Sequence, residues 1–144
     1  GGDVAFDNCT IYNNGVSGSE DALCLVLSSI AQNASGQGVN DLDQANFTNC
    51  IIYGSAEEQL GLFNDAQVSL NYSFTNCLAE SLLESEGGFT NCVFNQNPLF
   101  ENASSGNFHL EVNSPCIATG FNNGISEDIY FRPRTTFDIG AVAY

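Results

Sequence analysis

The tetrapeptide Phe-Thr-Asn-Cys occurs three times in this chain, at residues 47–50, 74–77 and 89–92, and a near copy, Phe-Asp-Asn-Cys, occupies residues 6–9. The copies are irregularly spaced, but the motif itself hardly varies. A fixed motif with variable segments between its copies is typical of a solenoid, in which each copy takes the same place in a successive structural repeat. This repetition constrains the fold more than any other feature of the sequence.

The apolar pattern within one copy slips by one residue at the asparagine. Alternation along a strand would place residue 49 on the same face as Phe47, but the next inward apolar residues are Cys50 and Ile52. Asn tolerates the left-handed backbone conformation better than other non-glycine residues, so Asn49 suits a sharp bend. Each copy therefore predicts two short strands joined at an Asn bend.

A single coil of this kind cannot bury its apolar side, whereas coils stacked at the spacing of paired strands can. We therefore predict an all-β fold, a right-handed parallel β-helix of five or six coils with a C-terminal capping segment. Phe is expected to stack on Phe, Cys on Cys, and Asn on Asn in a ladder of hydrogen-bonded amides. The predicted structural ladder consists of Phe6, Asn8, Cys9, Phe47, Asn49, Cys50, Phe74, Asn76, Cys77, Phe89, Asn91 and Cys92.

The intervals between the motif cysteines are 41, 27 and 15 residues, and they constrain the number of coils. The 27-residue interval fits one coil with a loop, and we interpret the 41-residue interval as two coils, the middle one formed by residues 21–30. The 15-residue interval is tight for a complete coil. Residues 55–63 and 78–88 have a helical alternative, because their Glu and Leu residues favour helix over strand.

The pattern changes after residue 97. Residues 98–144 contain a proline break, a turn at residues 104–106 and both arginines of the chain. A solenoid needs an end piece that stops further stacking. We therefore predict one structural domain, in which residues 1–97 form coils and residues 98–144 form a cap packed on the last coil. The residues assigned to the cap are Arg132, Arg134 and Asp138.

Four short segments of this end piece, together with the repeated motif, resemble the C-terminal region of bacterial secreted or surface right-handed parallel β-helix repeat proteins. The matching segments are residues 97–100, 107–110, 114–120 and 138–141. The resemblance implies a β-helix on the cell surface or outside the cell. The resemblance leaves the activity open, because the scaffold carries lyases, hydrolases, adhesins and stalks. The missing lysine base, the absence of a carboxylate motif and the cap-like ending lead us to expect a non-catalytic stalk, adhesin or glycan-binding segment of a larger exported protein. The chain begins Gly-Gly-Asp without Met, and we expect it to be a piece of a longer protein.

The chain is strongly acidic, with 17 Asp and Glu residues against two arginines, no lysine and a formal net charge of −15. Such a surface repels phosphate backbones and anionic lipids, so we expect neither nucleic-acid binding nor membrane insertion. No apolar run approaches the roughly 18 residues of a membrane span. The partners left open are carbohydrate and another copy of the chain.

The residue types argue against catalysis without excluding it. Polysaccharide β-elimination needs a strong base such as lysine, which the chain lacks, and hydrolysis needs facing carboxylates, whereas the acid pairs here lie on expected loops. The single histidine, His109, alternates with apolar residues on a predicted strand and has an expected structural role. The alternatives to a non-catalytic module are a β-helical polysaccharide hydrolase or lyase and a self-assembling extracellular filament subunit.

No cofactor is expected, and the one metal left open is Ca²⁺, for which Asp41 and Asp43 are the candidate ligands. The six cysteines contain no Cys-x-x-Cys pair suited to zinc. Stacked cysteines have parallel Cβ vectors, a poor geometry for a disulfide, so the sequence favours buried thiols that act as small apolar side chains.

Overall fold

The computed structural model describes residues 2–15, 23–33, 36–39 and 41–144, and two four-stranded parallel sheets dominate it. The first sheet consists, in spatial order, of β1 (Asp3–Asp7), β6 (Leu42–Thr48), β9 (Leu70–Thr75) and β11 (Phe89–Thr90). The second consists of β2 (Thr10–Asn13), β7 (Ile51–Gly54), β10 (Leu78–Ala79) and β12 (Val93–Phe94). A third, two-stranded parallel sheet pairs β3 (Leu25–Ser28) with β8 (Leu60–Phe63).

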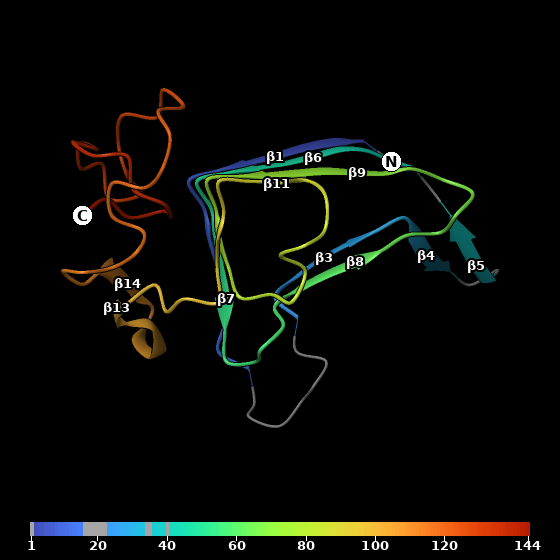
Figure 1. The fold of residues 1–144 in the computed structure, drawn as a ribbon, viewed down its shortest axis with the longest axis horizontal. Coiled ribbons are helices and arrows are strands. Elements are labelled where there is room, and N and C mark those ends of the chain that lie inside the picture. Colours follow the sequence, from blue (N-terminus) through green and yellow to red (C-terminus); the bar gives the residue numbers. More distant parts are fainter. Residues whose placement is uncertain (1, 16–22, 34–35, 40) are drawn as a thin grey trace.

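Successive strands of one coil belong to different sheets, and equivalent strands of successive coils pair in register. Figure 1 shows the coils superposed, with β1, β6, β9 and β11 along the upper side and β3 and β8 along the lower side. Phe6, Phe47, Phe74 and Phe89 occupy the same register position in the first sheet. The predicted all-β fold, a right-handed parallel β-helix, is confirmed.

The described residues form four coils, not the expected five or six, because the 41-residue interval is one coil and not two. Within residues 21–30, strand β3 is the third side of the first coil and pairs with the third side of the second. The extra length is an antiparallel hairpin of β4 (Ile30–Asn33) and β5 (Gly36–Val39), which projects from the coil in Figure 1. An inserted hairpin lengthens a coil without adding a layer to the stack.

The 15-residue interval is also one coil, shortened because it has no third strand. Residues 80–88 cross from β10 to β11 through turns and bends. Neither residues 55–63 nor 78–88 are helical, so the helical alternative was wrong there. The only helix among the described residues is a 3₁₀ turn, η1 (Ala103–Ser105), and no helix of the described residues is long and apolar enough to cross a membrane.

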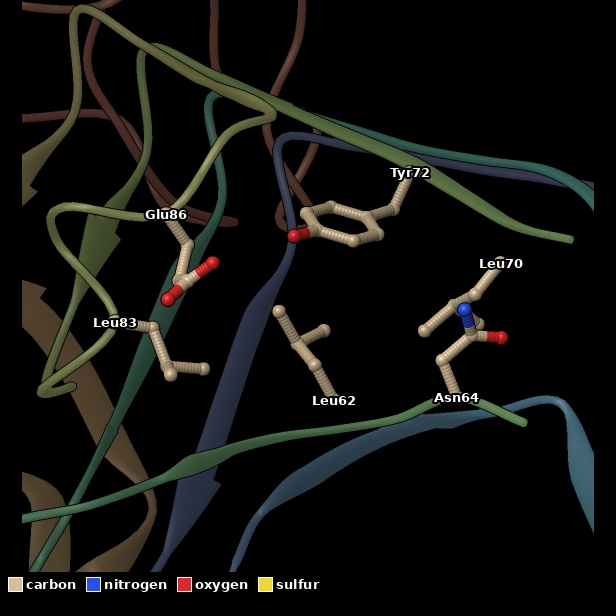
Figure 2. A pocket seen from close by; sticks show the side chains of 6 residues that line it. All are labelled: Leu62, Asn64, Leu70, Tyr72, Leu83 and Glu86. Atoms are coloured by element: carbon tan, nitrogen blue, oxygen red, sulfur yellow. The ribbon is translucent and has the colours of Figure 1, made fainter. Parts of the chain in front are cut away.

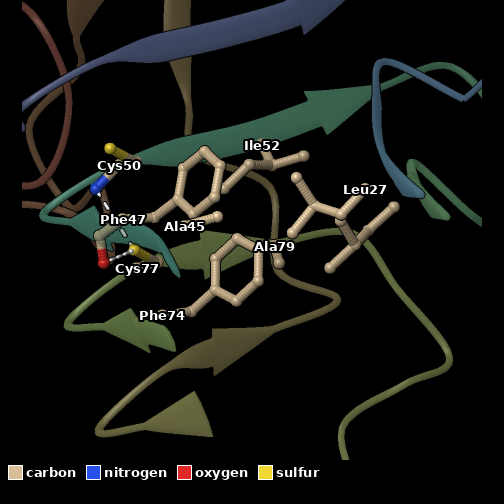
Figure 3. Close-up of a cluster of buried hydrophobic side chains, with 9 residues drawn as sticks. Leu27, Ala45, Phe47, Cys50, Ile52, Phe74, Cys77 and Ala79 are labelled. Atoms are coloured by element: carbon tan, nitrogen blue, oxygen red, sulfur yellow. Dashed lines mark hydrogen bonds between the residues drawn. The ribbon is translucent and has the colours of Figure 1, made fainter. Parts of the chain in front are cut away.

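The core inside the coils is built around stacked phenylalanines. The ring centroid of Phe47 lies 4.9 Å from that of Phe6 and 4.5 Å from that of Phe74. The ring centroids of Phe74 and Phe89 are 4.9 Å apart. Figure 3 shows the two central rings beside Ala45, Ile52, Ala79 and Leu27. Near-parallel rings follow from the in-register strands, because identical side chains then repeat at the strand spacing.

A second apolar cluster lies outside the coils, between the second sheet and the C-terminal segment. This segment begins with a hairpin of β13 (Phe100–Asn102) and β14 (Asn107–Leu110). The buried members of the cluster are Ile51, Leu78, Leu110, Cys116 and Ile139. Residues 98–144 were expected on the last coil, but they lie beside the coils (left in Figure 1). They hydrogen-bond to the first three coils and pack against Val93 of the fourth. The boundary at residue 97 stays a prediction.

Candidate functional site

The four corner asparagines have the left-handed backbone expected of them, with φ angles of 50°, 52°, 51° and 52° at Asn8, Asn49, Asn76 and Asn91. Their side chains do not form the expected amide ladder. Asn8 and Asn49 bond to the C-terminal segment through both amide atoms, and the Asn76 Nδ2 donates to the Thr119 carbonyl at 3.2 Å. The left-handed corner turns these amides outward, where the C-terminal segment supplies partners.

The backbone of the C-terminal segment approaches the second sheet closely at Gly140. This residue has a φ of +105°, and a Cβ atom there would lie 2.7 Å from the Ile51 Cδ1. The Gly140 N–H donates to the Asn49 carbonyl at 2.8 Å, and the next amide donates to the Thr10 hydroxyl. The sequence carried a signal for this packing that was missed, because an outward-facing apolar residue (Ile51, Leu78 or Val93) follows three of the four motif cysteines.

The cap residues named from the sequence hold the C-terminal segment in shape. Asp128 forms an ion pair with Arg132 at 2.7 Å, and its carboxylate also accepts from three backbone amides. Burial opposes the ionisation of Asp128, but the hydrogen bonds from Arg132 and these amides outweigh it and lower the pKa of Asp128. Asp138 accepts from the Ala118 and Tyr144 amides, and Arg134 donates to the Gly140 carbonyl.

His109 belongs to the same outer packing. Its ring stacks on Tyr130 with centroids 5.4 Å apart, and its Nδ1 lies 3.3 Å from the Arg132 Nη2. These contacts fit the structural role that the sequence predicted for this histidine.

The four motif cysteines lie one above another along the corner of the coils. None of the six cysteines of the chain forms a disulfide. The Cys50 amide donates to the Cys77 sulfur at 3.4 Å, and the Cys77 thiol approaches the Phe47 carbonyl (Figure 3). Hydrogen bonds from the Cys77 thiol to Cys50 and Cys92 raise the pKa of Cys77. The hydrogen bond between Cys77 and Cys92 lowers the pKa of Cys92 to about 7, although burial acts to raise it.

The two candidate calcium ligands, Asp41 and Asp43, differ in their contacts. The Asp41 carboxylate accepts from the Ser69 amide at 2.7 Å and so caps a neighbouring turn, while Asp43 is exposed. Among the described residues, no group of three or more His, Cys, Asp or Glu side chains is arranged to hold a metal ion.

A cavity of about 470 Å³ lies between β8, β9 and the loop of residues 80–88 (Figure 2). Its lining consists of Leu62, Asn64, Leu70, Tyr72, Leu83 and Glu86. It exists because the third coil lacks its third strand, so no strand of the described residues pairs with the second edge of β8. The sequence carries no signal for this site, because the repeated motif does not show which coils lack a strand.

The other candidate surface is the end of the solenoid formed by β1, β2 and β3. In the described residues these strands pair on one edge only. Val4 and Phe6 share register positions with the buried Ala45 and Phe47 and therefore face the core, yet they are 43% and 37% exposed. This end presents unpaired backbone groups together with core-type side chains.

No protein-family model, curated protein or solved structure matches this chain.

Proposed function

We propose that this chain is a non-catalytic segment of a β-helical stalk in a larger exported bacterial surface protein, and that a further β-helical coil stacks on its open end. The observation that carries the proposal is the exposure of Val4 and Phe6, which continue the buried ladder of Ala45 and Phe47 in register. Burying such side chains and pairing the strand edges is favourable, and another coil does both.

Three further features support this proposal. The resemblance of the end piece to exported bacterial β-helix proteins favours the extracellular or cell-surface location. The C-terminal segment lies beside the coils and leaves the open end accessible (Figure 1). The outward corner amides of Asn8, Asn49 and Asn76 are used for internal docking, a structural role.

The test measures self-association, because a second copy is the stacking partner that the isolated chain offers. Charge repulsion at −15 opposes contact at low salt, so sedimentation should show a monomer there and rising association as salt screens the acids. Val4→Asp should abolish this association. The matched control is Val112→Asp, since Val112 is an exposed valine outside the coils, in the C-terminal segment just after β14.

Three outcomes would contradict the proposal. A monomer at every salt concentration would mean that the open end does not stack, and equal effects of Val4→Asp and Val112→Asp would place the contact elsewhere. Release of reducing ends or unsaturated products from a panel of polysaccharides would favour the alternative, a β-helical polysaccharide-degrading enzyme.

A further inference from the structure

The cavity beside the third coil combines an apolar wall with a polar mouth. Leu62 and Leu70 come from β8 and β9, and Leu83 comes from the loop that replaces the missing third strand. Figure 2 shows these leucines around the hollow, with the Tyr72 hydroxyl and the Glu86 carboxylate above them. An apolar pocket with a few convergent polar groups, in the volume range of known ligand sites, is the usual form of a small-molecule site.

The polar groups at the mouth are available to a ligand. Within the described part of the chain no hydrogen bond involves the Tyr72 hydroxyl or the Glu86 carboxylate, and Glu86 is exposed. Asn64 is partly used, because its Oδ1 accepts from the Ser29 hydroxyl at 2.8 Å. Burial and the nearby Glu86 raise the pKa of Tyr72, so its hydroxyl keeps its proton and can donate or accept.

The Tyr72 ring is held in place before any ligand arrives. It packs against Phe74 and Phe89 with ring centroids 6.0 and 6.2 Å away. Gly88 lies so close that a Cβ atom there would be 2.6 Å from the Tyr72 Cε2. A fixed ring costs less conformational entropy on binding than a mobile one.

We propose that this cavity binds a small organic ammonium ion with an apolar body. The body would contact Leu62, Leu70 and Leu83, and the ammonium group would lie between the Glu86 carboxylate and the Tyr72 hydroxyl oxygen. Both oxygens can accept hydrogen bonds from an ammonium group, and the bond to the carboxylate is charge-assisted. The net charge of −15 raises the local concentration of cations and opposes anions of the same shape.

The experiment compares three unbranched ligands that each contain six carbon atoms: hexylammonium, hexanol and hexanoate. Titration calorimetry should show hexylammonium binding about tenfold more tightly than hexanol, because only the ammonium gains from Glu86, and hexanoate should not bind. Amide chemical shifts in an NMR titration should change at residues 62–64, 70–72 and 83–88. These residues locate the ligand independently of its affinity.

Two matched substitutions separate the site from the general acidity of the chain. Glu86→Gln should weaken hexylammonium binding about tenfold and leave hexanol unchanged. Glu84→Gln removes an equal charge from the same loop, at a residue that does not line the cavity, and should change either affinity less than twofold.

The proposal is overturned if hexanol or hexanoate binds as tightly as hexylammonium, or if both substitutions weaken binding equally. It is also overturned if none of the three ligands binds at millimolar concentration. None of these outcomes bears on the stacking of coils at the open end, which is tested by sedimentation.

Discussion

Asn49 and Phe121, 72 residues apart in the sequence, exchange two hydrogen bonds. The Asn49 Nδ2 donates to the Phe121 carbonyl at 2.7 Å, and its Oδ1 accepts from the Phe121 amide at 2.8 Å. The same residue forms the corner of the second coil, with φ at 52°. One asparagine therefore bends the coil and fastens the C-terminal segment to its side.

These two roles of Asn49 can be separated by mutation. Asn49→Gly keeps the left-handed backbone accessible but removes both side-chain bonds, and should lower the free energy of unfolding by about 2 kcal/mol. Asn91→Gly is the matched control, because Asn91 has the same φ but is exposed. It should change stability by less than about 0.5 kcal/mol. Urea unfolding measures both, and equal losses would show that the bend, not the docking, accounts for the effect.

The phenylalanine stack should be most sensitive at its centre. Phe74 is fully buried between Phe47 and Phe89, so Phe74→Ala should cost about 4 kcal/mol. Phe6 is partly exposed at the open end, and Phe6→Ala should cost about 1 kcal/mol. Thermal and urea unfolding test this order, and the reverse order would mean that the open end is covered in solution.

The thiols should react in an order set by their environments. Cys92 is half-buried with a pKa of about 7, so its alkylation by iodoacetamide should accelerate as the pH rises towards 7 and level off above it. Cys24 is also half-buried, but desolvation raises its pKa to about 11, so it should react slowly over the same range. Peptide mass spectrometry follows both sites, and faster labelling of Cys24 would contradict this order.

Acid should destabilise the C-terminal segment through Asp128. The folded-state pKa of Asp128 is below the unfolded value of about 3.9, so its stabilising contribution is complete above about pH 4 and is lost as the pH falls through the folded-state pKa. Asp128→Asn should cost about 2 kcal/mol at neutral pH and flatten the acid limb of the stability profile. Asp43→Asn, at an exposed carboxylate, is the control and should leave the profile unchanged.

The sequence alone determined the repeating corner. Each Phe-x-Asn-Cys motif contains its own bend, because Asn accepts the left-handed conformation and the apolar positions slip by one residue beside it. Stacking of Phe47 on Phe74 follows from parallel, in-register pairing, since identical residues then lie one above another. These are local rules repeated along the chain, so the fold class could be predicted from them.

Only the tertiary structure decided how many layers those corners make and what covers them. Residues 25–28 could be a separate coil or the third side of the first, and their pairing with β8 settles it. The hydrogen bond between Asn49 and Phe121 likewise joins residues that are far apart in the sequence. The cavity between Leu62 and Glu86 arises from a strand that one coil lacks. The local sequence around Leu62 and Glu86 does not predict this cavity, because the cavity depends on a strand that is missing beside them.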